Sequence, residues 1–254
     1  MLPASRFTLP MAPTLLTLVC TLLSQVAVAQ EAFDKYPFKL APPADLNYQI
    51  KARQNGFNVD GEARLKWSHG EGKYRVTSET RAMLVGKILD TKSEGVIDDF
   101  GLAPLNSTEK RFRKETGSTT FDRDGMRIRF SASGQSYPIK GGEQDRNSAI
   151  WQLIAVARAA PAKFKAGSEW KFFVAGQKDA EAWIFRVTRK EKISTPHGEL
   201  DTVRIEKKPP QDHQDQQVDI WLAPGLEWYP ARIRYTDPDG DYIEQNLASV
   251  TARE

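Results

Sequence analysis

Only one stretch of this sequence, residues 144–160 (QDRNSAIWQLIAVARAA), has the periodicity of an α-helix. Its apolar side chains recur at the spacing that places them on one helical face: Ile150, Leu153, Ile154 and Ala157. Asp145 or Asn147 can cap the start of this helix, and Pro161 cannot continue its end. Strand signals lie before and after it. The sequence therefore predicts a mainly β protein in which a curved sheet closes against a single main helix.

The segments outside this stretch alternate apolar and polar side chains over short distances, as strands with one wet face do. Residues 46–53 (LNYQIKAR) show the pattern most simply, and Asn55-Gly56 directly after them is a hairpin signal. Counting such segments gives roughly ten to twelve strands, too many for a flat open sheet. We therefore expect a strongly curved antiparallel sheet, or a barrel or half-barrel, that encloses the helix.

Three local expectations within this sheet can be checked directly. Residues 82–89 are read as a strand, although their apolar spacing also fits a helix. Pro230 is expected at the beginning of its strand or on an edge strand, because proline cannot donate to a hydrogen-bond ladder. The strand expected over residues 108–114 is strongly basic, and a solvated face or an edge strand protected by charge explains this better than an anion site.

Residues 1–29 have the organisation of a secretory signal peptide. Arg6 forms the charged region and residues 11–23 the apolar core, and cleavage is predicted after Ala29. A retained signal anchor is one alternative, but the apolar run is short for a membrane span, so no stable span is expected after cleavage. A lipoprotein signal is another, with Cys20 as the modified residue, but the preceding Val19 is bulky where such signals have a small residue.

Composition limits what the exported chain does. Cys20 is the only cysteine and is removed with the signal, so no disulfide or thiolate site is expected, which fits a bacterial periplasm. The proline-rich residues 30–44 should form an extended arm, and residues 45–254 a single β-rich domain. The near balance of 36 basic and 33 acidic residues predicts neither a nucleic-acid partner nor strong binding to a membrane surface.

No pattern identifies a cofactor or metal site, and none is expected. The glycines lie singly at turns, outside the strand-to-helix context of a phosphate-binding loop. His213 lies near three aspartates that suit a loosely held divalent ion: Asp212, Asp215 and Asp219. A solvated polar loop explains this group better, because the spacing is not that of a dedicated site.

Paired carboxylates leave a hydrolase acting on envelope glycan or lipid open as the alternative function. Glycoside hydrolysis needs two carboxylates at a defined separation. Asp98, Asp99 and Asp145 are the candidates, with His197 as a partner for one of them. Adjacent strand residues point to opposite faces, and aspartates are common in turns, so no catalytic residue is assigned.

The aromatic residues either fill the core or line a ligand cavity. The chain has 6 tryptophans and 12 phenylalanines, and small barrels do enclose ligands, although aromatics at alternating strand positions are more often core. The candidate ligand contacts that we single out are Trp151, Ile154, Phe172, Trp183 and Trp221.

Several motifs are spread along most of the exported chain: Asp60-Gly61, Gly101-Leu102-Ala103-Pro104, Phe121-Asp122, Gln144-Asp145, TPHGEL at 195–200, IWLAP at 220–224 and PARIR at 230–234. Together they resemble the uncharacterised bacterial family catalogued as domain of unknown function 3108. The resemblance implies an exported protein of undetermined activity and supplies no catalytic residues. It marks Gln144, Asp145, Pro196 and Gly198 as motif positions whose role it does not define.

These observations lead to one main hypothesis. The protein is expected to be periplasmic and non-enzymatic, and to bind an apolar or amphipathic envelope ligand, or a protein partner, in the concavity of its sheet. The inferred architecture is similar to that of the periplasmic lipoprotein carriers, although a shared fold does not establish a function. The hydrolase remains the alternative, and a purely structural role in the envelope is a third.

Overall fold

The computed structural model describes residues 34–207 and 216–253, which lie within one compact unit, Ala32–Glu254. The predicted signal peptide, its cleavage after Ala29 and Cys20 fall outside the described residues. Residues 34–43 have no regular secondary structure and lead into the first strand.

Strands dominate the described residues. The first eight are β1 (Ala44–Gln54), β2 (Phe57–Gly70), β3 (Lys73–Ala82), β4 (Gly86–Asp98), β5 (Gly101–Arg111), β6 (Gly117–Asp122), β7 (Arg127–Phe130) and β8 (Ser133–Pro138). After them come β9 (Gln144–Asp145), the helix α1 (Arg146–Ala159) and a 3₁₀ turn, η1 (Pro161–Lys163). The chain ends with β10 (Glu169–Ala175), β11 (Ala180–Thr195), β12 (Gly198–Lys207), β13 (Gln217–Leu222), the 3₁₀ turn η2 (Pro224–Leu226), β14 (Pro230–Thr236) and β15 (Tyr242–Ala252).

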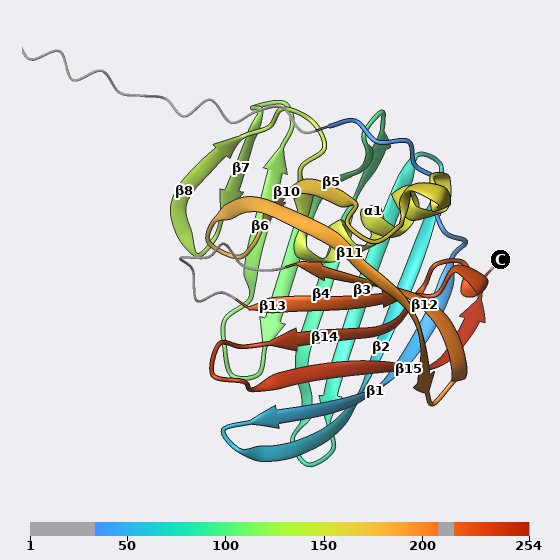
Figure 1. Cartoon of the computed structure of the whole chain (residues 1–254). Coiled ribbons are helices and arrows are strands. Elements are labelled where there is room, and N and C mark those ends of the chain that lie inside the picture. The colour runs from blue at the N-terminus through green and yellow to red at the C-terminus, as the bar shows by residue number, and fades with distance from the viewer. Residues whose placement is uncertain (1–33, 208–215, 254) are drawn as a thin grey trace, which may run out of the picture. The chain divides into compact units, whose positions relative to one another are not determined.

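All of these strands belong to one sheet of 15 strands, so the expected number of ten to twelve was too low. The order is β8-β7-β6-β5-β4-β3-β2-β1-β15-β14-β13-β12-β11-β10-β9, and every pair is antiparallel except β9 with β10. The strands that the sequence count missed are β8, which is polar and lacks alternation, and β9, which has only 2 residues. The curved sheet around one main helix was predicted correctly (Figure 1).

The local expectations had mixed outcomes. Pro230 begins β14, as predicted, although β14 lies inside the sheet. The strand expected over residues 82–89 is interrupted, because residues 83–85 form the turn between β3 and β4. The basic segment does not belong to an edge strand. β5 ends at Arg111 and pairs with both β4 and β6, so protection of an edge does not explain its charge.

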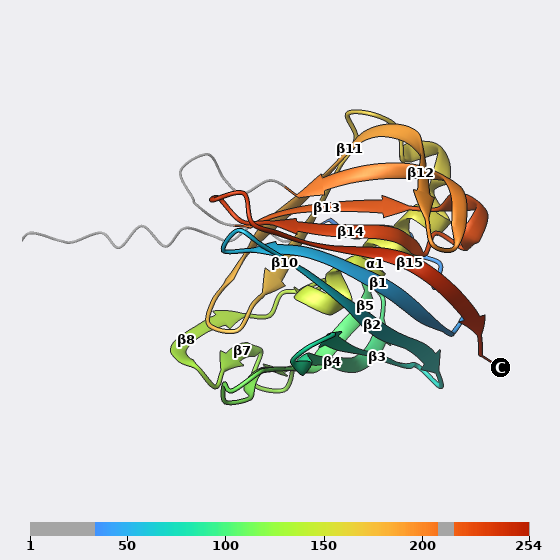
Figure 2. The ribbon, with the colours of Figure 1, turned by 90° about the horizontal axis from the view of Figure 1, so that it is seen from below.

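The sheet is rolled so that its two ends overlap. On β10, Trp170, Phe172 and Val174 face the concave side and belong to the inner core. The alternate residues Phe173 and Ala175 face the convex side. There they pack in a separate seam cluster: Phe121, Ile128, Phe130, Ile139, Phe173 and Ala175. The strands β6 and β7 therefore cover the outside of β10, and Figure 2 shows this end of the sheet beside β10.

Side chains, rather than a strand ladder, join the overlapping ends. The Thr119 hydroxyl donates to the Gly176 carbonyl at 2.7 Å, and the Ser133 hydroxyl donates to the Lys178 carbonyl. Among the described residues no backbone hydrogen bond links β5–β8 to β9–β11. The sheet is curved and open in its hydrogen bonding, and its interior is closed by packing.

The helix α1 lies against the concave side of the sheet. Its residues from Ser148 to Ala157 are all buried, and Trp151 stacks on Trp67 of β2 with ring centroids 4.3 Å apart. Asp145 caps the helix, with Ser148 completing a capping box, as one of the two predicted caps. Burying a side chain such as Leu153, which is 0% exposed, contributes about 1.5–3 kcal/mol to folding.

Candidate functional site

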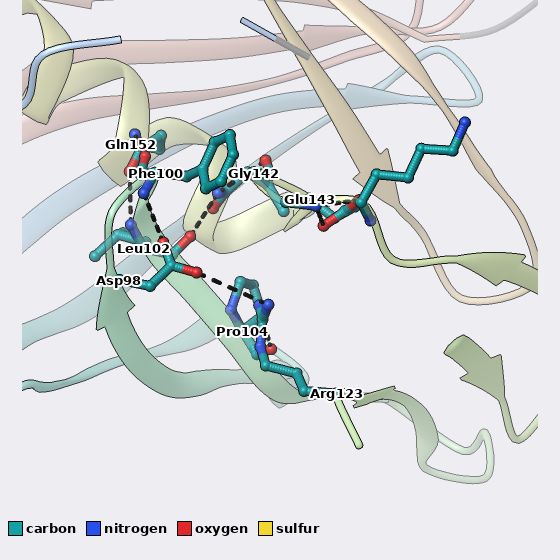
Figure 3. A network of polar contacts seen from close by, with 11 residues as sticks. Asp98, Phe100, Leu102, Pro104, Arg123, Gly142, Glu143 and Gln152 are labelled. Atoms are coloured by element: carbon teal, nitrogen blue, oxygen red, sulfur yellow. Dashed lines mark hydrogen bonds and ion pairs between the residues drawn. The ribbon is translucent and has the colours of Figure 1, made fainter. Parts of the chain in front are cut away.

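Two buried glutamines tie α1 to the first residues of β5. The Gln152 side chain accepts a hydrogen bond from the Leu102 amide at 2.8 Å and donates to the Phe100 carbonyl at 2.8 Å (Figure 3). Gln144 donates to the Leu102 carbonyl at 2.7 Å. The motif residues at 101–104 and 144–145, which are distant in the sequence, therefore meet in space. Both glutamine side chains form hydrogen bonds with backbone groups of residues 100–102. Their role is therefore structural, as a joint that holds the start of β5 to β9 and α1.

Asp145 lies at the same joint and is almost fully buried, at 1% exposed. Its carboxylate accepts hydrogen bonds from the Asn147 and Ser148 amides and from the Ser93 hydroxyl. Burial raises the pKa of Asp145, and these hydrogen bonds oppose the rise. No ion pair to Asp145 occurs in the described part of the chain. The two amide contacts are those of a helix cap, and the Ser93 hydroxyl ties the cap to β4.

The structure does not bring the proposed hydrolytic groups together. Asp98 accepts from the Phe100 amide, and its other oxygen lies 3.9 Å from Arg123 (Figure 3). Asp99 has a side chain that is 87% exposed and pairs with Lys35. His197 is exposed in the turn between β11 and β12. These groups and Asp145 cap turns, cap the helix or meet solvent.

Most of the loop in which the sequence offers ligands for a divalent ion lies outside the described residues. His213, Asp212 and Asp215 lie outside the described residues, and Asp219 pairs with Arg204 at 2.9 Å. Across residues 34–207 and 216–253, no group of three or more His, Cys, Asp or Glu side chains has metal-binding proximity.

Most of the candidate ligand contacts lie in the inner core. Trp151, Ile154, Phe172 and Trp183 are all buried there. Trp151 and Ile154 lie on α1, and the rings of Trp183 and Phe172 are on directly paired residues of β11 and β10. The upper part of the concave face is thus filled by the helix and these rings.

Trp221 is separate from them, on the convex side. It packs with Ile193, Ala223 and Ala231 under the end of the β11–β12 hairpin, and its indole nitrogen donates to Glu191 at 2.8 Å. The hairpin is held down by His197, whose amide donates to the Leu247 carbonyl. Two arginine side chains lie over the Trp221 ring: Arg204 and Arg232.

The motif residues Pro196 and Gly198 form the turn of this hairpin. Gly198 has φ +130°, a conformation that other residues rarely adopt. Pro196 precedes it in the exposed turn. Both residues therefore have a structural role, because their turn lets the β11–β12 hairpin fold back over the convex face.

The helix covers only part of the concave face. α1 has 14 residues and spans about 21 Å, whereas β2, also with 14 residues, spans about 46 Å. Figure 1 shows the strands β2–β4 continuing well beyond the helix. The inner face at that end is therefore left without a covering element.

One row of directly paired residues crosses this uncovered part, and we call it the open row: Val59, Ala52, Ile243, Tyr235, Val218 and Lys207. Val59, Ile243 and Tyr235 are apolar or aromatic and only half-buried. Burial raises the pKa of Tyr235 to about 12, although its side chain keeps some exposed surface. Val59, Ile243 and Tyr235 pack against the edge of the inner core and keep part of their surface exposed.

Cations lie at one side of the open row. Lys207 is 3% exposed, pairs with Glu181 at 3.4 Å and lies 4.9 Å from the centre of the Trp183 ring. Arg146, the first residue of α1, is exposed and lines a small crevice with Ser107, Glu109 and Gly176. Arg146 lowers the pKa of Tyr235 and Glu109 raises it, while burial dominates.

Sequence reasoning did not identify the open row. Its members come from β1, β2 and β12–β15, so only the strand register aligns them. The one available signal was Lys207, an inward-facing lysine in a strand whose other inward residues, Val203 and Ile205, are apolar.

The sequence family can now be stated. The model of DUF3108, a protein family of unknown function, matches residues 47–247. That is most of the chain, so the protein belongs to this family, and the resemblance noted in the sequence is confirmed. A comparison with curated proteins gives no significant match. Among the residues that the structure describes, no helix is long and apolar enough to cross a membrane.

Solved structures align with this chain at low sequence identity. A β-barrel-like protein of domain of unknown function DUF1849 from Brucella abortus aligns with a TM-score of 0.57 and 12% identity, covering 85% of this chain and all 100% of its own. A DUF1329 family protein from Desulfovibrio piger has a TM-score of 0.31 and 9% identity over 84% of this chain and 86% of its own. The first likeness supports a barrel-like fold and nothing further.

Proposed function

We propose that this member of the DUF3108 family is exported and binds an amphipathic envelope ligand, an acyl chain with an acidic head group, along the open row. The observation that carries the proposal is the row itself. Partly buried apolar side chains on a concave face lead to a nearly buried lysine. Concave, mainly apolar walls with a few polar groups are the usual form of small-molecule sites. The signal-like pattern of residues 1–29 supports export.

The two ends of the row suit the two parts of such a ligand. Val59, Ile243 and Tyr235 offer apolar surface to an acyl chain, and each buried CH₂ contributes about 0.8 kcal/mol. Lys207 and Arg146 offer positive charge to the head group. Glu181 already neutralises part of the Lys207 charge, so a singly charged acid fits better than a polyphosphate.

The proposal keeps the class of ligand expected from the sequence but assigns its contacts to the open row instead of the five residues singled out there. Trp183 borders the proposed site through Lys207, whose ammonium lies over its ring. Trp151, Ile154 and Phe172 belong to the buried inner core. Trp221 stabilises the convex hairpin and takes no part.

The direct test is to purify the protein from its own host and look for a bound amphiphile by native mass spectrometry. A mass difference that disappears on solvent extraction, with a lipid in the extract, is the expected result. Protein without any bound amphiphile that also fails to bind a fluorescent fatty acid would contradict the proposal.

Matched substitutions locate the site. Ile243→Gln in the open row should weaken binding of the fluorescent fatty acid at least several-fold. Ile184→Gln should not, because Ile184 is 41% exposed on the convex side of β11. Lys207→Gln should weaken binding of the acid but not of the corresponding fatty alcohol, since only the acid uses the positive charge. Equal effects on acid and alcohol would remove Lys207 from the site.

A further inference from the structure

The turn between β3 and β4 exposes three consecutive apolar residues. Leu84 is 100% exposed, Met83 79% and Val85 53%. Tight hairpin turns normally carry Gly, Asn, Asp, Pro or Ser, and a run of exposed apolar residues is unfavourable in water unless something covers it. This turn is fixed rather than loose, because the Met83 amide donates to the Asp60 carbonyl of β2 at 3.1 Å.

Neighbouring connections at the same end of the sheet carry further exposed aromatics. Phe112 follows β5 and is 45% exposed. Its amide donates to the Ile88 carbonyl at the start of β4, which places it next to the turn. Phe57, the first residue of β2, is 75% exposed. We call Met83, Leu84, Val85, Phe112 and Phe57 the apolar rim. Figure 1 shows the β3–β4 turn at the end of the sheet farthest from α1.

Positive charge surrounds this rim. Arg81 and Lys87 flank the β3–β4 turn, although each has an acidic partner: Glu79 for Arg81, and Glu79 and Asp90 for Lys87. The end of β5 adds Lys110, and the connection after it adds Arg113 and Lys114. These three side chains form no ion pair with any residue that the structure describes. The guanidinium of Arg113 lies 4.9 Å from the centre of the Phe112 ring. Residues 110–115 carry four basic side chains against one acidic side chain, Glu115, so the local excess of positive charge lies at the end of β5 and in the connection after it.

We propose that the apolar rim docks on an anionic lipid bilayer, with the β3–β4 turn inserted at the boundary between head groups and acyl chains. Apolar side chains combined with flanking lysine and arginine bind such interfaces, where the charges meet the head groups. Lys110, Arg113 and Lys114 account for the choice of an anionic surface. The rim ends the strands that carry Val59 and Ala52, so docking turns the open row toward the bilayer. The docking surface exists whether or not the row holds a ligand.

The test places an environment-sensitive fluorophore on the turn. The exported chain, which begins at Gln30 and has no cysteine of its own, carries Leu84→Cys and is mixed with vesicles of phosphatidylcholine alone or with a third of phosphatidylglycerol. We expect a blue shift with the anionic vesicles that weakens as salt rises, because salt screens the flanking charges. The control is Met126→Cys in the same background. Met126 is 52% exposed in the β6–β7 turn at the opposite end, and its label should not shift.

Vesicle flotation with unlabelled variants separates the two components. Replacing Met83, Leu84 and Val85 together by serine should lower binding to anionic vesicles at least tenfold, and so should replacing Lys110, Arg113 and Lys114 by serine. Met126→Ser should have no effect. No shift at position 84, equal shifts at positions 84 and 126, or unchanged flotation of the triple variants would each overturn the proposal. Loss of fatty acid binding by Ile243→Gln with docking retained would separate this surface from the ligand site.

Discussion

The two halves of the concave face are made of the same kind of strand but differ in how deeply their side chains are buried. Under α1, Trp67 and Leu102 are 0% exposed and Trp151 is 2% exposed, and both buried glutamines bond to backbone groups. Along the open row, Ile243 and Tyr235 keep exposed surface on the same inner face. The difference comes from the length of the helix, which is short relative to the strands. The covered half supplies most of the fully buried core, and the other half carries the proposed ligand site.

The strongest test of this comparison places a charge in each half. Leu153→Asp puts a carboxylate among fully buried residues, and we expect a loss of about 4 kcal/mol or more in the free energy of unfolding, or failure to fold. Thermal unfolding followed by circular dichroism measures it. Ile243→Asp in the open row should cost no more than about 1 kcal/mol, since water reaches that position.

A stable, folded Leu153→Asp protein would show that α1 is a detachable lid and not part of the core. The comparison would then fail, because both halves of the concave face would be available to a ligand.

A smaller effect on stability is expected when one glutamine in each half is replaced by leucine. Gln152→Leu leaves the Leu102 amide and the Phe100 carbonyl without their buried partner, which should cost about 2–4 kcal/mol. Gln245→Leu is the matched change, on a half-buried, inward-facing residue of β15. It should change stability by less than about 0.5 kcal/mol. Denaturant titrations of both variants would show the difference, and equal losses would contradict it.

The smallest effect concerns pH and the helix cap. The pKa of Asp145 is raised in the folded state, so its contribution to stability is fully present below the unfolded-state pKa, near 3.9. That contribution is lost as pH rises through the folded-state pKa. Asp145→Asn keeps a capping side chain but does not titrate. Its unfolding free energy should therefore fall less between acid and neutral pH than that of the native protein.

Parallel stability curves for the native protein and Asp145→Asn across this pH range would argue against a titrating buried carboxylate. A lower stability of the variant at every pH would instead show that both carboxylate oxygens are needed at the joint with Ser93.

The features that the sequence did predict are those set by neighbouring residues. The helix follows from the spacing of Leu153 and its apolar neighbours, and Asp145 from cap chemistry. Pro230 marked the beginning of β14 for the same local reason. The family motifs were recognisable as well, although the sequence did not show that Gln144 bonds to Leu102.

The features that it did not predict depend on pairing over long distances. In the run Ile220, Trp221, Leu222, both faces of the strand are apolar, so alternation does not say which side is the interior. The structure places Ile220 and Leu222 inside and Trp221 outside. The open row likewise exists only because the register brings Val59, Ile243 and Tyr235 into line.

The overlap of the sheet's ends has a consequence for how such a protein can vary. In a closed barrel, every strand is part of a continuous hydrogen-bonded ring, so the strand number and the tilt are fixed together. Here β8 and β9, the strands at the two ends of the sheet, are not hydrogen-bonded to each other. The two ends meet through side chains, among them Phe121 and Phe173 of the seam cluster. Strands at the free ends can therefore be gained, lost or lengthened over generations without changing the diameter of the barrel.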